Sequence, residues 1–546
     1  MSSRPAYYVT TPIYYVNDRP HIGHCYTTLV ADAAARFMRL AGRDVFFLTG
    51  TDEHAEKVVT SAQEHGVSPI EWADRNAQAF REAFGEMGFS HDDFIRTTEP
   101  RHIGRVEGYI RALQATGDIY LGDYVGWWDP SQEEYVTETT AREHDYKSPV
   151  TGRELVKRTE RNYFFRLSAY QDRLLAHIEA NPGFLRPDAR RNEVVGRIRQ
   201  GLQDVPVSRA IDESDAASRW GIRMPEDPSH RIYVWIDALF NYLSTVDTPE
   251  RERFWPADLH LIGKDILWFH AVIWPCMLMA LQRDLPGCVY AHSYWIREGR
   301  KMSKSLGNFI DMPTLRAYVG RYGLDAVRWH LLTQGPLGAT DADFAHAKFV
   351  EVYNADLANG IGNAASRVSN MIGKYFDGAC PDPKGVTSHA GHDWPAIAGA
   401  CAEGALRRIE SADFAGALQE GIALTRRVDG YVNATEPFKI AKDDARRDEL
   451  GAILYHCAEA LRIAALLLLP AMPATMTDML GRFSSAPKKG ETFDDLARWG
   501  GLRPGAGIEK GESLFPRADA KEAPPDGGAP GAGKGPGDLP GAGLGA

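Results

Sequence analysis

Two histidines near the start of the chain have the spacing of a phosphate-binding turn. The run His21-Ile22-Gly23-His24 follows a short β-rich segment and opens a helical pattern. On a first helical turn the two imidazoles would share one face and donate hydrogen bonds to charge developing on a phosphate. The helix N-terminus adds free N–H groups and partial positive charge, and Gly23 lets a nucleotide approach the backbone. Alone, the four residues also fit a chance match with two solvated histidines.

A second cluster that suits phosphate chemistry lies about 280 residues further on. The run Lys301-Met302-Ser303-Lys304-Ser305 stands between Gly299 and Gly307, and flanking glycines allow a mobile loop. Two ammonium groups three residues apart can follow a triphosphate as point charges. By itself the run also fits a solvated basic turn. Both runs in this order, with an interrupted βα pattern between them, favour a nucleotide site.

A third set of residues has helical spacing. Ile266, His270 and Trp274 are four residues apart, so a regular helix would place them on one face. Such a face would suit a thioether, which is soft and polarizable and packs well against aromatic walls. It also fits ordinary core with His270 hydrogen-bonded internally, and spacing alone favours that alternative.

The elements that must position these residues predict an α/β fold with one divided parallel sheet. Residues 6–10 and 45–48 predict strands joined by a helix over 23–40, with Gly42 at its C-terminal cap. The polar, turn-rich segment 117–228 indicates an inserted domain. The βα pattern then resumes, with strands expected at 232–236, 259–262 and 289–296 and a helix at 264–281. From residue 347 to 498 the pattern is helical, which is typical of a bundle.

These patterns divide the chain into six parts. The boundaries are 1–116 for the first half of the sheet domain, 117–228 for the insertion, 229–310 for the second half, 311–346 for the region after the Lys run, 347–517 for the bundle and 518–546 for a tail rich in Gly, Ala and Pro. We expect the tail to be disordered because it cannot bury enough apolar surface.

The composition limits the possible classes of protein. With 44% hydrophobic and 25% charged residues in 546, the chain is globular and has more than one core. The net charge of −11 excludes a protein whose whole surface binds nucleic acid, although a local basic patch remains possible. No run approaches the ~18 apolar residues of a membrane span, and the N-terminus lacks a secretion signal. Six Cys without a Cys-x-x-Cys pair suit a reducing cytosol, so we expect a cytoplasmic protein.

Around both runs the sequence resembles the class I aminoacyl-tRNA synthetases, and within them the methionyl-tRNA synthetase family. The resemblance extends from about residue 6 to about residue 517. It rests on long blocks, which are Thr11-Pro12-Ile13-Tyr14-Tyr15-Val16-Asn17, Thr49-Gly50-Thr51-Asp52-Glu53-His54, Trp235-Ile236-Asp237-Ala238-Leu239, Ile262-Gly263-Lys264-Asp265-Ile266 and Asn354-Ala355-Asp356-Leu357-Ala358-Asn359.

The resemblance implies both architecture and activity. The sheet domain would be a Rossmann-like catalytic domain, 117–228 a connective insertion, 311–346 a stem-contact region and 347–517 an anticodon-binding bundle. The implied enzyme is a methionine–tRNA ligase, which activates methionine with ATP to methionyl-adenylate and transfers it to the 3′ end of tRNA(Met) for protein synthesis, including initiation. The expected ligands are ATP with Mg²⁺, L-methionine and tRNA(Met).

The resemblance also implies roles for individual residues. The catalytic residues would be His21, His24, Lys301 and Lys304, and ATP would meet these four together with Gly23, Gly263 and Asp265. The methionine site would comprise Ile13, Tyr15, Asp52, Trp235, Leu239, Tyr242, Ile266, His270 and Trp274, with Asp52 on the ammonium. The anticodon would meet Asn363, Arg367 and Phe438.

Several of these residues also fit purely structural roles. Asp52 fits a salt-bridged loop carboxylate, Gly263 a strand-end turn and Asp265 a helix N-cap. Asn363 and Arg367 are four residues apart, hence on one helical face, and also fit a solvated polar surface. The family motif favours the functional reading of each.

The chain departs from the family in three places. No Cys lies between Cys25 and Cys276, so the insertion cannot form a four-thiolate zinc site, and we expect the zinc-free branch with no metal site. Phe438 stands where the family often has Trp, and offers a smaller π face to a base. The family's C-terminal tRNA-binding and dimerising appendix is not found, so we expect a monomer with no membrane partner.

Two other functions remain open at this point. One is a nucleotidylyltransferase that uses the same His run on a small substrate without tRNA. The other is a non-catalytic tRNA-binding relative on the same fold. The helical segment after residue 347 and the Lys run count against the first, and two intact runs count against the second.

Overall fold

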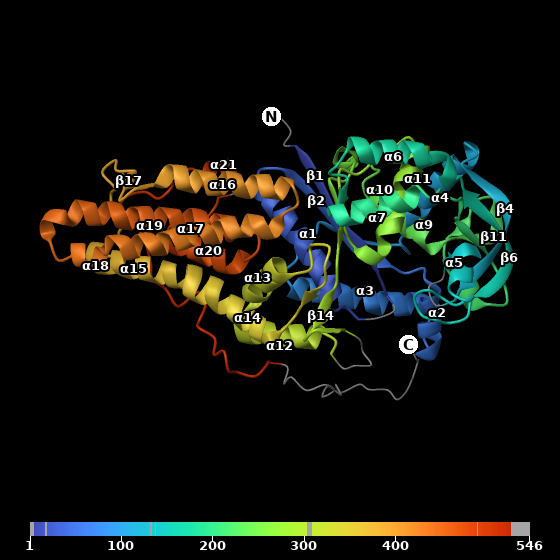
Figure 1. The fold of residues 1–546 in the computed structure, drawn as a ribbon, viewed down its shortest axis with the longest axis horizontal. Helices are drawn as coiled ribbons and strands as arrows, with labels where there is room; N and C mark the ends of the chain where they lie inside the picture. The colour runs from blue at the N-terminus through green and yellow to red at the C-terminus, as the bar shows by residue number, and fades with distance from the viewer. Residues whose placement is uncertain are drawn as a thin grey trace.

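Six parallel strands form a sheet near the middle of an elongated molecule, between a helical bundle at one end and strands of the insertion at the other (Figure 1). The computed structural model describes residues 5–16, 19–130, 134–136, 138–302, 308–488 and 490–525. In the order of the sheet the strands are β3 (Asp93–Arg96), β2 (Asp44–Asp52), β1 (Ala6–Tyr15), β12 (Leu259–Gly263), β13 (Val289–His292) and β7 (Leu185–Arg186). All five pairings are parallel, which confirms the predicted α/β class.

The two halves of the sheet meet at its centre. Val9 of β1 pairs with Leu259 of β12, and Tyr8 pairs with Phe46 of β2. The chain leaves β1 towards β2 on one side and returns to β12 on the other only after the insertion. This reversal of strand order opens a crevice at the carboxyl ends of β1 and β12, which is where open α/β sheets bind ligands.

Helix α1 (Ile22–Leu40) connects β1 and β2 and is buried along most of its length. Gly42, two residues beyond the end of the helix, has a φ of +81°, in the left-handed region that the sequence predicted for a cap. Helices α2 (Glu56–Glu64), α3 (Pro69–Glu86) and α4 (Pro100–Ala115) complete the first half. Asp32 of α1 forms a buried ion pair of 2.6 Å with Arg328, which lies on a later helix. This ion pair holds α1 against that helix.

The insertion contains two small sheets. One has four antiparallel strands, in the order β5 (Glu134–Val136), β4 (Ile119–Asp129), β6 (Val156–Phe165) and β8 (Val205–Pro206). The other has the order β10 (Arg223–Met224), β11 (Asp227–Ile232) and β9 (Ser208–Ala210). The helical elements are α5 (Glu138–Glu143), η1 (Leu167–Tyr170), α6 (Gln171–Ala180), α7 (Asp188–Ile198) and α8 (Ala216–Arg219).

The structure corrects two details of the predicted organisation. Within the segment assigned to the insertion, β7 joins the main sheet by pairing Leu185 with Val289, so the segment does not form one separate body. A two-residue strand is too short to leave a hydrophobic pattern. Residues 232–236 do not form a strand, because β11 ends at Ile232 and helix α9 (Val234–Leu239) follows. There tertiary contacts override the β propensity of the sequence.

The second half of the sheet domain is built from short elements. They are α10 (Asn241–Ser244), η2 (Glu252–Phe254), η3 (Lys264–Ile266), the π-helix η4 (Phe269–Ile273) and α11 (Trp274–Ala280). A small sheet of β15 (Arg300–Lys301), β14 (Trp295–Arg297) and β16 (Ala342–Asp343) includes Lys301, and α12 (Met312–Tyr322) and α13 (Leu324–Gln334) lead to the bundle.

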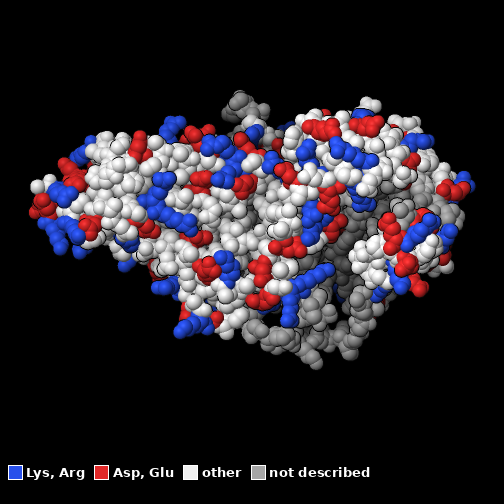
Figure 2. Space-filling model, in the orientation of Figure 1, with Lys and Arg blue, Asp and Glu red and all other residues white. Residues whose placement is uncertain are grey.

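The bundle follows the predicted helical pattern with one addition, the β17–β18 hairpin (Ser388–His389 and His392–Asp393). Its helices are α14 (His346–Val352), the π-helix η5 (Tyr353–Gly362), α15 (Asn363–Phe376), α16 (Trp394–Glu410), α17 (Phe414–Thr435), α18 (Pro437–Ile440), η6 (Asp444–Arg446), α19 (Arg447–Leu468), α20 (Pro473–Arg482) and α21 (Phe493–Leu496). Acidic and basic side chains are interspersed over both ends of the molecule on the face shown in Figure 2.

Helix α19 is the buried centre of the bundle. Residues 444–468 are long and apolar enough to cross a membrane by length and composition, although the sequence analysis found no such run. The apolar window is completely buried inside the bundle, as the core helix of a bundle is. Within it, Glu459 pairs with Arg462 at 2.7 Å and also accepts hydrogen bonds from the backbone N–H groups of residues 500–502.

The chain after residue 502 runs back along the bundle. The side-chain amide of Asn354, in η5, donates to the backbone carbonyl of Ala518 at 2.9 Å and accepts from its backbone N–H at 3.0 Å, and Arg321 lies 3.5 Å from Glu522. The predicted tail therefore begins too early, because residues 518–523 make specific polar contacts with the domain. A side-chain amide that pairs with the backbone leaves no composition signal. Residues 526–546 lie outside the described residues.

Candidate active site

A cavity of about 430 Å³ opens at the carboxyl ends of β1 and β12, at the centre of the sheet. It brings together residues from both halves of the sheet domain, although the insertion separates them in sequence. Of the residues singled out from the sequence, it is lined by Ile13, Tyr15, His21, Gly23, His24, Asp52, Trp235, Leu239, Tyr242, Gly263, Asp265, Ile266 and His270.

The two histidines of the His run cap helix α1 reciprocally. The Nδ1 atom of His21 accepts a hydrogen bond from the backbone N–H of Gly23 at 3.0 Å, and the Nδ1 of His24 accepts from the backbone N–H of His21 at 3.3 Å. A backbone N–H can only donate, so Nδ1 carries no proton in either ring and Nε2 is the protonated nitrogen. Burial, and then the neighbouring His21, lower the pKa of His24 well below its usual range. At neutral pH the His24 ring is therefore neutral, and the Nε2–H group of each ring is available as a donor at the helix N-terminus.

Gly23 and Gly263 leave room for these functional side chains. A Cβ atom on Gly23 would lie 2.9 Å from Cε1 of His21, and one on Gly263 would lie 2.7 Å from Oδ1 of Asp265. Any larger residue would displace His21 or Asp265 from its place. The two glycines thus set the shape of the cavity wall along which a nucleotide would lie.

Of the Lys run, Lys301 lies on strand β15, which pairs with β14. Lys301 is exposed and lies outside the cavity lining. Lys304 falls in 303–307, outside the described residues. The segment that follows docks on the His run, because the backbone N–H of Ile22 donates to the carbonyl of Ile310 at 3.0 Å and the Phe309 ring packs edge-on against His21 at 4.8 Å. The structure thus brings residues 309–310 against the His run, and Lys304 remains a prediction.

The other end of the cavity has aromatic walls. Trp235 stacks on Phe269 with ring centroids 4.1 Å apart, and Tyr15 meets Trp235 edge-on at 5.8 Å. His270 Nδ1–H donates to the carbonyl of Ile266 at 2.9 Å, so its Nε2 accepts from the Tyr242 hydroxyl at 2.7 Å. Burial lowers the pKa of His270 to about 4 and raises that of Tyr242, so both are neutral at pH 7. This end suits an apolar, polarizable side chain.

Trp274, which the family resemblance assigns to the methionine site, does not line this cavity. Residues 269–273 form a π-helix, in which residues four apart no longer lie on one face. Trp274 is turned into the core, where its Nε1–H donates to Nε2 of His260 at 3.3 Å. Its indole supports the wall from behind, next to Tyr242 at 6.0 Å between ring centroids.

Asp52 lies in the same cavity as the aromatic walls. Asp52 is the last residue of strand β2, in the first half of the sheet domain, and it is only 2% exposed. A carboxylate in a cavity of this size would bind a cationic group more strongly than it could in water, because the surroundings are poor in solvent.

The sequence analysis missed His292 and Thr27 as lining residues. His292 ends β13, and its Nε2 lies 2.7 Å from the Thr27 hydroxyl of α1, which joins the sheet to the phosphate-facing helix. Its Nδ1–H donates to the Ser293 carbonyl at 2.7 Å, and burial lowers its pKa. The position of a polar residue at the carboxyl end of a parallel strand was the available signal. The other lining residues that were missed are Pro12, Tyr14, Ala238, Asn241 and Tyr294.

The three predicted anticodon residues lie far along the bundle. Asn363 is exposed at the start of α15, and Arg367 follows one turn later. The Arg367 guanidinium lies 3.4 Å from Asp429 and donates to Asn433 Oδ1 at 3.1 Å, both on α17. Phe438 is 47% exposed on α18, five residues after Asn433. This surface of charged, amide and aromatic groups is of the kind that binds unstacked bases.

Comparison with known proteins finds relatives that match this chain over both the sheet domain and the helical bundle. The family model described as tRNA synthetases class I (M) matches residues 7–144 and 139–369. Methionine–tRNA ligase of Bacillus subtilis is 42% identical over 533 residues, which cover 94% of this chain and 78% of that protein. The Streptomyces coelicolor methionine–tRNA ligase is 42% identical over 537 residues, covering 95% and 98%. Mycobacterium tuberculosis methionyl-tRNA synthetase, solved in complex with methionyl-adenylate, superposes with a TM-score of 0.83 at 37% identity over 94% of this chain and 100% of that one.

Proposed function

The chain belongs to the class I methionyl-tRNA synthetase family, and from this we propose how its own residues activate methionine and charge tRNA. The protein is a methionine–tRNA ligase that uses ATP to form methionyl-adenylate. One observation carries the assignment of roles: a single cavity holds the capped N-terminus of α1 at one end, and Asp52 with the aromatic walls at the other. A phosphate would fit the first end and an amino acid with an apolar side chain the second.

The first reaction is an in-line displacement at phosphorus. A methionine carboxylate oxygen forms a bond to the α-phosphorus of ATP, the bond from that phosphorus to the bridging oxygen breaks, and pyrophosphate leaves with the electron pair. The carboxylate is already ionised, so the step needs no general base. The protein positions the reactants and stabilises developing charge. The Nε2–H groups of His21 and His24 donate to phosphate oxygens, and Lys301 and Lys304 meet the pyrophosphate end.

Methionine and the adenosine occupy different parts of the cavity. Asp52 holds the ammonium, and Trp235, Leu239, Tyr242, Ile266 and His270 surround the thioether. Gly263 and Asp265 meet the adenosine. In the second reaction, a hydroxyl of the terminal adenosine of tRNA attacks the acyl carbon, and AMP leaves. The family resemblance implies that this is the 2′ hydroxyl.

We propose Mg²⁺ as the companion of ATP and no structural zinc. Among the residues that the structure describes, no group of three or more His, Cys, Asp and Glu is arranged to hold a metal ion. The phosphates of ATP would therefore carry Mg²⁺, which binds few protein ligands and keeps several waters in nucleotide sites. Mg²⁺ supplies charge neutralisation on the phosphates. We also propose that the protein acts as a monomer.

We propose that the bundle reads the anticodon with side chains that activation does not use. Arg367→Ala should reduce charging of tRNA(Met) by about 100-fold and Phe438→Ala by about 10-fold, because contacts to a base and stacks on a ring are each worth ~1–3 kcal/mol. Both variants should keep methionine-dependent exchange of pyrophosphate into ATP within about twofold of the parent, since that reaction needs no tRNA. The two reactions are measured on the same preparations.

The control for this experiment is Arg408→Ala. Arg408 also makes surface ion pairs in the bundle, with Asp413 at 2.6 Å and Glu420 at 3.1 Å, but lies away from α15 and α18. It should leave both reactions unchanged. Equal loss of charging and exchange in Arg367→Ala would indicate a folding defect, and unchanged charging would place the anticodon site elsewhere.

A further inference from the structure

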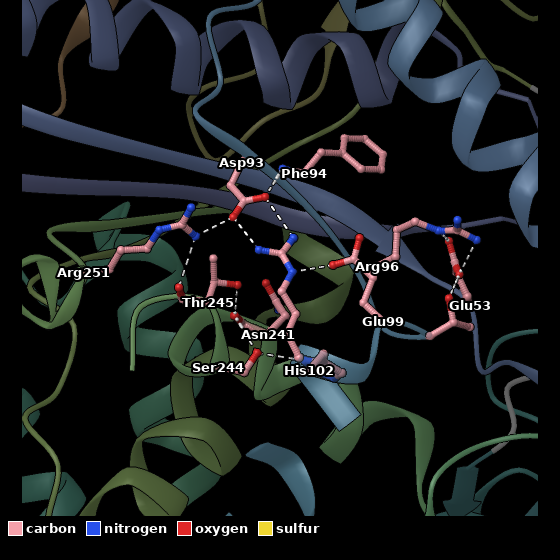
Figure 3. A network of polar contacts seen from close by, with 12 residues as sticks. Glu53, Asp93, Phe94, Arg96, Glu99, His102, Asn241, Ser244, Thr245 and Arg251 are labelled. Carbon is pink, nitrogen blue, oxygen red and sulfur yellow. Dashed lines mark hydrogen bonds and ion pairs between the residues drawn. The ribbon is translucent and has the colours of Figure 1, made fainter. Parts of the chain in front are cut away.

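A buried carboxylate behind the cavity binds two imidazoles. Asp237 of α9 is 1% exposed, and its two oxygens lie 2.6 Å from His54 Nδ1 and 2.7 Å from His102 Nε2. The other nitrogen of His102 lies 2.8 Å from the Ser244 hydroxyl, a contact that Figure 3 shows within a larger polar network. His54 and His102 belong to the first half of the sheet domain, and Asp237 and Ser244 to the second.

The negative charge of Asp237 strengthens its hydrogen bonds to the two imidazoles. Burial alone would raise the pKa of Asp237, but His54 and His102 outweigh it and lower that pKa to about 2. The carboxylate is therefore ionised at neutral pH, and both imidazole nitrogens that face it donate. Charge-assisted hydrogen bonds in a buried site are short and directional, so the carboxylate fixes the two rings and the segments that carry them.

His54 lies two residues after the substrate-facing Asp52. The residue between them is anchored as well, because Glu53 is fully buried and makes two hydrogen bonds to Arg96, of 2.7 and 3.0 Å (Figure 3). The backbone N–H of Glu53 also donates to the Thr97 hydroxyl at 2.9 Å. The segment 52–54 is thus tied to β3 and the turn after it through Glu53, and to α9 through His54.

Asp237 itself lies among residues that form the opposite wall of the cavity. Trp235, Ala238 and Leu239 of the same short helix line the cavity, whereas Asp237 points behind it to the imidazoles. The contact between His54 and Asp237 is thus a direct polar bridge between the wall that carries Asp52 and the wall that would hold the substrate side chain. It crosses the interval of 183 residues that includes the insertion.

We propose that His54 and Asp237 are positioning residues that set the distance between the ammonium site at Asp52 and the side-chain wall of α9, and thereby the length of side chain that the enzyme accepts. This inference rests on the proposed roles of Asp52 and α9. His102 completes the bridge by holding the second oxygen of Asp237. Loss of the bridge lets α9 move relative to β2, so the cavity no longer discriminates sharply against a longer unbranched side chain.

The test is the selectivity of Asp237→Asn for methionine over ethionine, whose side chain is one methylene longer. A well-fitted pocket discriminates one methylene by about 10- to 200-fold in kcat/KM. In amino-acid-dependent pyrophosphate exchange, we expect Asp237→Asn to lower this selectivity at least tenfold and to raise the KM for methionine, with the KM for ATP unchanged. The Asn amide keeps the size of the side chain but cannot accept from both imidazoles. His54→Gln, whose amide N–H can still donate to Asp237, should keep more selectivity than His54→Ala.

Glu459→Gln is the matched control for the loss of a buried, ion-paired carboxylate. It should lower the melting temperature but leave the selectivity unchanged. If Asp237→Asn shows reduced activity with the selectivity of the parent, or if the His54 pair shows no rescue, the positioning role is wrong. If Asp52→Asn leaves methionine binding unchanged, the proposed function of the ammonium site fails instead, so the two failures are distinguishable.

Discussion

His24→Ala should slow the formation of methionyl-adenylate by about 100- to 1,000-fold, the cost of removing one preorganised donor to a developing charge. The reason is the cap geometry: His24 Nδ1 is engaged by a backbone N–H, so Nε2–H at the start of α1 is the donor that the cavity offers. Because this donor acts mainly in the transition state, kcat and kcat/KM should fall together while the affinity for methionine stays the same. Single-turnover activation and equilibrium binding of methionine measure the two quantities.

The control separates catalysis from loss of the helix cap. Ser68 and Glu71 form the same reciprocal cap at the start of α3, away from the cavity, so Glu71→Ala should cost similar stability without slowing activation. His24→Gln, which restores an N–H donor, should recover part of the rate. A rate unchanged in His24→Ala, or one lowered equally in Glu71→Ala, would contradict the role.

The pH dependence of the His24 effect follows from the direction of its pKa. Burial holds the pKa of His24 well below 6.5, so the ring is neutral throughout the range from pH 6.5 upward. The neutral, capped form is lost only as pH falls through the depressed pKa, where protonation of Nδ1 breaks the bond to His21. The rate ratio between the parent and His24→Ala should therefore be the same at pH 7 and pH 8.5.

Asp52→Asn should weaken methionine binding by about 100-fold, equivalent to ~3 kcal/mol, because it leaves a desolvated ammonium without its counter-charge. Asn keeps the size of the side chain, and Asp52 is 2% exposed, so little else in the cavity should change. The KM for ATP should remain as in the parent. The quenching of tryptophan fluorescence on binding, with Trp235 in the cavity wall, gives the affinity directly.

An analogue that lacks the ammonium completes a thermodynamic cycle. 4-(Methylthio)butanoate keeps the thioether and the carboxylate but has no amino group. The parent should bind it much more weakly than methionine, and Asp52→Asn should bind it no more weakly than the parent does. Equal losses for methionine and for this analogue would mean that Asp52 acts on the fold and not on the ammonium.

Local signals predicted the parts of the site that neighbouring residues determine. The helix expected at 23–40 is observed at Ile22–Leu40, with His21 as N-cap and Gly42 beyond its end. This prediction was possible because capping and hydrophobic periodicity depend on residues close together in the sequence. A continuous apolar run likewise predicted the buried strand β2, a short β-rich run predicted β1, and the resumed βα pattern predicted β12. The strand expected at 45–48 stopped short of Asp52, which the structure places at the end of β2.

Tertiary contacts decided the parts that the sequence did not show. The π-helix at 269–273 turns Trp274 into the core, and no residue type marks that extra residue per turn. Helix α9 forms in place of an expected strand, and its Asp237 is held by two histidines from the other half of the domain. Strand β7 joins the main sheet through two residues only, and residues 518–523 are held by Asn354 and Arg321. Each depends on a partner more than 100 residues away, or on a backbone irregularity.

The most direct test of the central claim is amino-acid-dependent exchange of labelled pyrophosphate into ATP by the purified chain, with Mg²⁺ and without tRNA. The cavity joins a phosphate-binding helix terminus to an ammonium site and a thioether-sized aromatic pocket. We therefore expect rapid exchange with methionine and at least 100-fold slower exchange with leucine, isoleucine or cysteine. These side chains differ from methionine in length, branching or polarity, and such differences add up in a fitted pocket. Exchange driven better by one of those three amino acids, or exchange independent of any amino acid, would contradict the assignment.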